Sequence, residues 1–486
     1  MSIAPENQAV ALESRKLQDP NKPAPLKLPP EETIPATLWQ AGAGRFWLAV
    51  ALTGAATGLG AAALTRLLEF VQHLAWHGSG TNILEAGQHA SALRCVLVLF
   101  GAGVLTGIGQ ILLKQLTSGN GIDTTAAIWF YAGRMPALRT LGSAVLSIFV
   151  VGMGSSMGRE GAPKQAGAVF ANFFSDWKRL SDEQRRLLVA CGAGAGMGAA
   201  YGVPLGGALF AIEVMRGKLA LRYVLPALVA SIIATAVSWI WLPNQATYVF
   251  PSYAVSASVL IWALLAGPLA GLASVAYVRM VRWADKNKPT GWQRVLAPVV
   301  VLTAVGAVAT RYPYILGNGK DTSQLLFVGG LAPLAVLAVF FLKPAATILC
   351  MRSGAPGGLF TPSLTTGALL GAVLGLGWSH LWPGVPAGLF ALLGAGAMLG
   401  ATTQGPISAI VLMIELTGQA RSFILPMFVV VCLATLVARS VESRSIYDAK
   451  LSDDEIVERQ KLRDATAQEI WPNQKKLTGS GSERAF

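Results

Sequence analysis

The chain has 486 residues, of which 53% are hydrophobic and only 13% are charged, whereas an average globular protein carries about 25% charged residues. Residues 1–46 hold 10 of the 63 charged residues and residues 439–486 hold 18, while the stretches 223–278 and 353–414 hold none. Because roughly 20 apolar residues span a bilayer, this pattern excludes a soluble enzyme and predicts an all-α polytopic membrane protein.

The first segment, residues 1–45, combines seven prolines with mixed charge and lacks the basic-then-apolar pattern of a signal peptide. We expect a disordered cytoplasmic tail there. The net charge of +13 comes largely from short basic clusters such as 178–186 and 279–294, which fit cytoplasmic loops of a membrane protein. No basic stripe with interleaved aromatic residues indicates nucleic acid, and four cysteines without CxxC spacing indicate neither a metal site nor a cofactor.

The membrane part contains an internal repeat. Residues 192–215 align without gaps to 394–417 with nine identities, GNGIDT (119–124) matches GNGKDT (317–322), and REGAP (159–163) matches RSGAP (352–356). Three matches in one order at offsets of 193 to 202 predict two homologous repeats, at 46–240 and 255–440. A linker at 241–254 joins them, and a polar segment, 441–486, follows. Such repeats, often inverted in the membrane, are typical of transporters with a substrate site between the halves.

Several apolar runs are broken by glycine and proline, at 152–163, 202–207 and 353–362. Glycine-rich runs often serve helix packing, and that reading is favoured for 192–200. Discontinuous helices, however, also aim backbone groups at an ion inside the bilayer. We favour this second role for 154–163, because charged residues are embedded in it.

Residues 152–167 place Arg159, Glu160 and Lys164 inside an otherwise apolar span, and ionisable groups at membrane depth indicate function. The pattern predicts flexible backbone followed by a helix start, whose free N–H groups and partial positive charge favour an anion. The carboxylate of Glu160 would compete for the same position and would leave on protonation, as a gate and proton carrier. The alternative is a loop glutamate that pairs with Arg159 or Lys164.

The mirror segment 353–364, SGAPGGLFTPSL, is predicted to break a helix and restart it after Pro362, with the amides of Leu359 and Phe360 available as donors. A third candidate is GNGIDT, in which the side-chain NH₂ of Asn120 lies between two glycines. The alternative for Asn120 is a helix cap or turn, where asparagine is common.

GREGAP, GGLFTP, the GVPLGGALFAIE block and SIY (445–447) together resemble the CLC family of chloride channels and chloride/proton antiporters. The resemblance covers residues 45–450 and is greatest to the bacterial voltage-gated-type ClcB branch. It implies a fold of two inverted-topology repeats with 18 helices, many tilted or re-entrant. It further implies a homodimer with one ion pathway per subunit, both termini cytoplasmic, in the bacterial inner membrane.

The resemblance also assigns roles to residues. Glu160 matches the external gating glutamate, and the amides of Arg159, Glu160 and Gly161 would line the outer anion site. The amides of Leu359 and Phe360 would hold the central ion, and the hydroxyl of Tyr447 would reach it from the inner side. Glu213 and Glu415 match acidic residues near helix ends, for which we expect a structural role.

The sequence also departs from the family's motifs. The first motif, GSGIP, reads GNGID here, so Asn120 stands beside Gly121 in place of the inner serine, and Asp123, in place of proline, is expected to cap the next helix. Proline in GREGP is displaced to Pro163. Val214 occupies the position of the internal proton-transfer glutamate. Strict proton coupling by the usual route is therefore not expected, although water or Glu213 could substitute.

Two functions within this family remain open from the residues: chloride transport, channel-like or with altered proton coupling, and fluoride/proton antiport, with which the loss of the inner serine is compatible. An intramembrane hydrolase is a weaker alternative. A catalytic serine in GMGSSMG (152–158) needs a positioned base. Three of the four histidines, His73, His77 and His89, lie outside the repeated core, and His380 lies in WSHLWP, which we interpret as an interfacial anchor, so no histidine is expected to serve as that base.

Overall fold

The computed structural model describes residues 34–35, 39–40, 42–77, 82–116, 123–251, 253, 255–419, 423–449 and 451–470, with side chains up to residue 461. Within these residues all regular secondary structure is helical, apart from one isolated backbone bridge. Most of the predicted tail at 1–45, and the chain after residue 470, lie outside the described part.

The helices of the first half follow in chain order: α2 (Ala43–Trp76), α3 (Ile83–His89), α4 (Ala92–Leu116), α5 (Thr124–Phe130), α6 (Ala137–Gly152), α7 (Gly161–Trp177), α8 (Asp182–Tyr201), α9 (Pro204–Leu209), the π-helix η2 (Phe210–Arg216) and α10 (Leu221–Ser238). Those of the second half are α11 (Ala257–Lys286), α12 (Gln293–Ala309), the 3₁₀ helix η3 (Pro313–Ile315), α13 (Lys320–Phe327), α14 (Pro333–Ser353), α15 (Phe360–Leu381), α16 (Ala387–Thr403), α17 (Pro406–Thr417) and α18 (Ile424–Val441). A last helix, α19 (Asp453–Ile470), follows.

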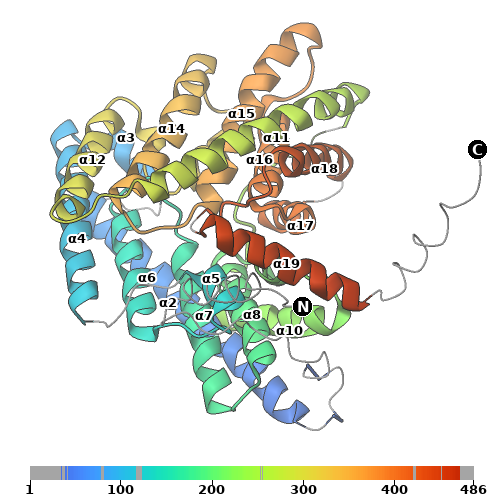
Figure 1. Cartoon of the computed structure of the whole chain (residues 1–486). Helices are drawn as coiled ribbons and strands as arrows, with labels where there is room; N and C mark the ends of the chain where they lie inside the picture. The colour runs from blue at the N-terminus through green and yellow to red at the C-terminus, as the bar shows by residue number, and fades with distance from the viewer. Residues whose placement is uncertain are drawn as a thin grey trace, which may run out of the picture.

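The two halves repeat the same packing. Helix α7 packs on α8 as α15 packs on α16, and α2 packs on α10 as α11 packs on α18, while α4 and α12 contact each other across the halves. In Figure 1 the helices α11 and α14 to α18 of the second half lie above α5, α7, α8 and α10 of the first, α4 lies beside α12, and α19 crosses the front. The fold is therefore the expected one of two inverted-topology repeats.

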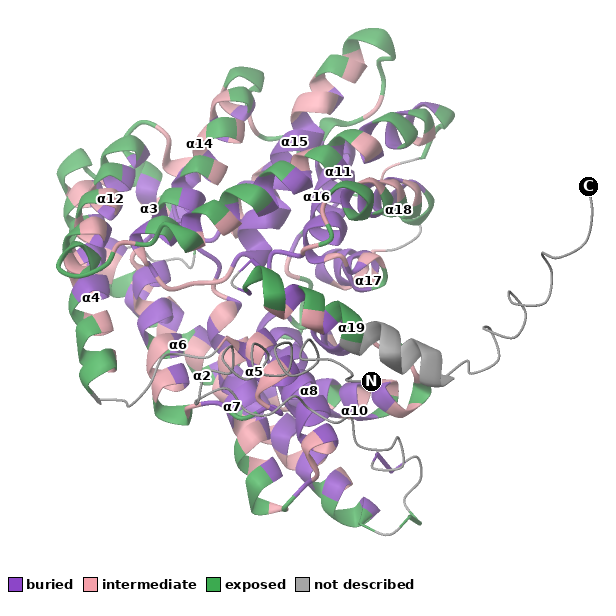
Figure 2. Ribbon diagram, viewed as in Figure 1, coloured by how far each residue is buried: buried purple, intermediate pink, exposed green. Residues whose placement is uncertain are grey.

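Within the part of the chain that the structure describes, seven helices are long and apolar enough to cross a membrane: α2, α4, α10, α11, α14, α15 and α18. Other apolar helices, such as α16 and α17, are shorter than a full span. Figure 2 shows exposed positions concentrated on the outer helices, whereas α8 and α16 are buried along most of their length. The protein is an integral membrane protein with helices of uneven length, as predicted.

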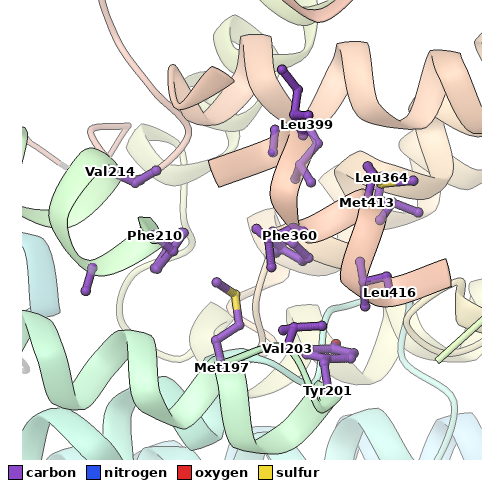
Figure 3. Packing of buried hydrophobic residues seen from close by; sticks show 14 of the residues in the cluster. Met197, Tyr201, Val203, Phe210, Val214, Phe360, Leu364, Leu399, Met413 and Leu416 are labelled. Atoms are coloured by element: carbon purple, nitrogen blue, oxygen red, sulfur yellow. The ribbon is translucent and has the colours of Figure 1, made fainter. Parts of the chain in front are cut away.

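Side chains of both halves form one apolar core between the repeats. Figure 3 shows Tyr201 and Phe210 from the first half facing the region of Phe360 from the second. Several ionisable side chains are buried elsewhere in the interior, and one of them is a lysine. Lys343 of α14 is fully buried and donates to the backbone carbonyls of Ile315 at 2.9 Å and Gly317 at 2.7 Å. The lysine thereby satisfies carbonyls at the end of η3 that have no helical partner.

Helix α19 is attached to the membrane part by charged contacts. The carboxylate of Asp453 accepts hydrogen bonds from Arg444 and from Arg282 of α11. Further along, Arg459 pairs with Asp448 and lies 5.1 Å from the centre of the Trp129 ring. Because Asp448 directly follows Tyr447, α19 holds the segment that carries this tyrosine against the helices.

Candidate functional site

The N-termini of α7 and α15 meet at the interface between the repeats. Gly158 and Gly358, just before these helices, exchange two backbone hydrogen bonds of 2.8 and 2.7 Å. The predicted breaks at 152–163 and 353–362 are confirmed, since α6 ends at Gly152 and α14 at Ser353. The expected restart after Pro362 is wrong by a few residues. Helix α15 begins at Phe360, and proline is tolerated in its first turn because N–H groups there have no helical partner.

The carboxylate of Glu160 lies at the N-terminus of α15, and the residue is only 3% exposed. Its Oε1 accepts hydrogen bonds from the amides of Phe360 at 2.7 Å and Thr361 at 3.4 Å. Its Oε2 lies 3.1 Å from the hydroxyl of Thr361 and 3.4 Å from that of Tyr201. A helix N-terminus of this kind is a general anion-binding position, and here a carboxylate fills it.

Two glycines make room for this carboxylate. A Cβ added at Gly158 or at Gly358 would collide with the carboxylate of Glu160. The same pair of residues also forms the backbone bridge between the repeats. Glycine is therefore required on both sides for the carboxylate to reach the amides of α15.

A cavity of about 990 Å³ reaches the start of α15, where the Glu160 carboxylate is bound. Gly161, Gly358 and Leu359, the N-cap residue of α15, line it together with Tyr447. The ring of Tyr447 packs edge-on against Phe210, at 5.4 Å between ring centres. The cavity therefore brings the predicted inner tyrosine and the start of α15 to one space.

The charged side chains around this cavity are predominantly basic. They are Lys114, Arg139, Lys164, Lys288 and Arg294, with Asp123 and Asp285 as the acidic members. The Nζ of Lys164 lies 4.3 Å from the centre of the Tyr447 ring. A concave surface with an excess of one charge raises the local concentration of ions of the opposite sign, so the cavity favours anions.

The remaining predicted residues are distributed as follows. The guanidinium of Arg159 lies 4.9 Å from the centre of the Tyr201 ring, next to the carboxylate site. Asn120 and Gly121 lie outside the described residues. Asp123 caps α5, because its side chain accepts the amide of Thr125 at 2.9 Å. The expected capping role of Asp123 is thereby confirmed.

Glu213 and Glu415 make reciprocal contacts between the repeats. The carboxylate of Glu213 accepts the amides of Ile407 at 3.2 Å and Ser408 at 2.6 Å, at the start of α17. The carboxylate of Glu415 accepts the amides of Leu205 at 3.0 Å and Gly206 at 2.6 Å, at the start of α9. Each glutamate caps a helix of the opposite repeat, as the expected structural role requires.

Tyr201 and Thr361 contact Glu160 but were not singled out from the sequence. Thr361 directly follows Phe360 in the GGLFTP motif, so the motif itself contained the signal. Tyr201 ends α8, 41 residues after Glu160, directly after the glycine-rich run 192–200 that we interpret as a packing surface. Nothing in that run indicates a polar contact, because the contact depends on how α8 and α15 meet.

Comparison with known proteins gives one consistent result. The family described as voltage gated chloride channel matches residues 102–439, more than half of the chain. The voltage-gated ClC-type chloride channel ClcB of Escherichia coli O81 is 30% identical over 329 residues, covering 65% of this chain and 76% of its own.

Solved structures share the fold. The X-ray crystal structure of a slow cyanobacterial Cl−/H+ antiporter superposes with a TM-score of 0.73 at 21% identity, covering 86% of this chain and 98% of its own. A CLC-type fluoride/proton antiporter gives 0.63 at 22% identity, covering 84% and 98%. These structures show the fold. The family match over residues 102–439 and the ClcB relative show that the chain belongs to the voltage gated chloride channel family, CLC, in its ClcB branch.

Proposed function

We propose that this protein transports chloride across a membrane and that the carboxylate of Glu160 is its gate. The observation that carries the proposal is the position of this carboxylate, which accepts the amide of Phe360 at 2.7 Å where a helix N-terminus would otherwise hold an anion. Protonation or displacement of the carboxylate would free that position. The amides that now bind Glu160 would then bind the transported ion.

The route proposed for the ion runs from the basic cavity to the start of α15. Support comes from the residues at its inner end, where Leu359, Gly161 and Tyr447 line one space. The amides of Leu359 and Phe360 and the hydroxyl of Tyr447 are the proposed donors for a central ion. Asn120 and Gly121 are proposed as further donors on the strength of the motif resemblance alone.

We further propose that proton coupling is absent or uses an altered route. Val214, which replaces the family's internal glutamate, lies in η2 and its methyl group packs near Gly405. An aliphatic side chain cannot carry a proton. The neighbouring Glu213 caps α17, which favours a structural role for it over proton transfer.

The proposed setting is the bacterial inner membrane, with a homodimer as the assembly and both chain ends in the cytoplasm. Basic residues at the junction of α11 and α12 support this orientation through the positive-inside bias: Lys288 lies in the loop between the helices and Arg294 in the first turn of α12. The homodimer follows from the family resemblance, and cross-linking in native membranes tests it.

The test is anion efflux from liposomes that contain the purified protein, with chloride and fluoride compared and external pH recorded. We expect chloride efflux that changes in Glu160→Gln, without stoichiometric proton uptake. Glu415→Gln serves as a matched control, because it neutralises a carboxylate at a different helix N-terminus. A strong preference for fluoride, with proton movement, would support the alternative of a fluoride/proton antiporter. Absence of anion flux from folded protein would refute both.

A further inference from the structure

The carboxylate of Glu160 is bound on one side by hydroxyl groups. Its Oε2 lies 3.1 Å from Oγ1 of Thr361 and 3.4 Å from the phenolic oxygen of Tyr201. These two hydroxyls lie 2.8 Å apart. All three side chains are at most 5% exposed, so water does not readily replace one of them as a partner.

Counting protons assigns different roles to the two hydroxyls. Each hydroxyl has one hydrogen to donate, and an ionised carboxylate only accepts. The shortest pair of contacts gives a chain in which Tyr201 donates to Oγ1 of Thr361, at 2.8 Å, and Thr361 donates to Glu160, at 3.1 Å. Thr361 is then the direct donor, and Tyr201 orients its hydroxyl.

The ring of Tyr201 has its own supports. The guanidinium of Arg159 lies 4.9 Å from its centre, and the ring of Phe360 lies 6.4 Å away between centres. The Arg159 side chain also interacts with the Tyr201 hydroxyl. Tyr201→Phe removes the hydroxyl while the ring keeps these two neighbours. Thr361→Val likewise removes only a hydroxyl at nearly constant shape.

We infer that Thr361 and Tyr201 form a hydroxyl latch that holds the Glu160 carboxylate in its closed position and so raises the chloride concentration needed to displace it. The inference rests on the proposed function, in which chloride and the carboxylate compete for the same helix N-terminus. Tyr201 is a positioning residue in this arrangement, because it acts through Thr361. Hydrogen bonds to a charged group are stronger than neutral ones, so the latch favours the ionised, closed gate.

The experiment measures initial chloride flux into liposomes against chloride concentration for the full-length protein. We expect Thr361→Val to lower the KM for chloride about tenfold or more, the effect of one lost hydrogen bond to a charged group, and Tyr201→Phe to lower it by less. The double variant should match Thr361→Val, because Tyr201 acts through that hydroxyl. Thr361→Ser keeps the donor and should retain the original KM.

Each variant is also made in a Glu160→Gln background. There the expected shifts in KM shrink strongly, because the charged acceptor of the latch is gone. If Glu160→Gln itself leaves flux unchanged, the proposed function fails. If Glu160→Gln alters flux but Thr361→Val leaves KM unchanged, only the latch is refuted. A KM that rises equally in both backgrounds would also refute it, since the hydroxyls would then bind the ion instead of the gate.

Discussion

The reciprocal glutamate caps provide a sharp test of how this protein handles protons. Glu213 stands next to Val214, where the family carries its internal proton glutamate, so a proton role is conceivable from sequence position alone. Its carboxylate, however, accepts two amides at the start of α17. Glu415 has the same geometry at the start of α9. Glu213→Gln and Glu415→Gln therefore form a matched pair of variants.

The expected magnitude follows from the lost interactions. Glutamine keeps one carbonyl oxygen and loses the negative charge and the second acceptor. Loss of charge at a helix N-terminus costs about 0.3–1 kcal/mol, and loss of one hydrogen bond costs about 0.5–1.5 kcal/mol. Each variant should thus lose roughly 1–2.5 kcal/mol. The two losses should be similar, because the short contacts to Ser408 and Gly206 are both 2.6 Å.

The assay compares thermal unfolding in detergent with chloride and proton flux in liposomes. If both glutamates are caps, each variant lowers the Tm by a few degrees, and neither changes the ratio of proton to chloride flux at temperatures where it is folded. The reasoning is refuted if Glu213→Gln abolishes a measurable proton flux while its Tm stays at the original value. Glu213 would then be a proton carrier that replaces the glutamate missing at position 214.

Three other variants test separate parts of the structure. Gly358→Ala, just before α15, introduces a methyl group that collides with the Glu160 carboxylate and should raise chloride flux, whereas Gly377→Ala within α15 meets no atom within 4 Å and should leave the flux unchanged. Lys343→Met leaves buried carbonyls without their donor and should lower the free energy of unfolding by about 2 kcal/mol or more. A lower Tm would show this loss, and an unchanged Tm would contradict the role of Lys343 in satisfying these carbonyls. The hydrogen bond from Arg444 lowers the pKa of Asp453 from its ordinary value of 3.8. The ionised contact therefore stabilises docking of α19 at neutral pH, and this stabilisation is lost as the pH falls below 3.8 and through the lowered pKa. After correction for the intrinsic pH dependence of exchange, the backbone amides of 453–461 should therefore be less protected at low pH than at neutral pH. In Asp453→Asn they should already be less protected at neutral pH.

Local signals in the sequence predicted the broken helices and singled out Glu160, the proposed gate. Glycine and proline mark where α6 ends and α7 begins, and an embedded charge distinguished Glu160 from other loop residues. The contacts of that carboxylate could not be predicted, because Thr361 is 201 residues away in the chain. Distances of this kind depend on how two repeats pack, and no periodicity within either repeat encodes them.

The reciprocal caps made by Glu213 and Glu415 could be predicted from the sequence only in part. The offset of 202 residues already aligned Glu213 with Glu415, and the same offset relates Gly206 to Ser408, the residues whose amides they bind. A two-fold relation between the repeats converts one such contact into two. The sequence therefore predicts that the two glutamates make equivalent contacts. It does not predict which helix each of them caps, because that depends on how the repeats pack.

The structure uses one interaction, a carboxylate at a helix N-terminus of the opposite repeat, in two different ways. Glu213 and Glu415 lie within the helical segments η2 and α17, and each carboxylate accepts two amides of the opposite repeat. Glu160 instead precedes α7, and its carboxylate lies against two glycines with the cavity beginning at Gly358 and Leu359. The second repeat has Leu359 at the equivalent N-cap, so only one of the two paired helix starts carries an acidic side chain there. Because the Glu160 carboxylate lies before a helix and beside the cavity, an ion that enters the cavity can compete for its position, and Glu160 is therefore the member of this set that we propose as the gate.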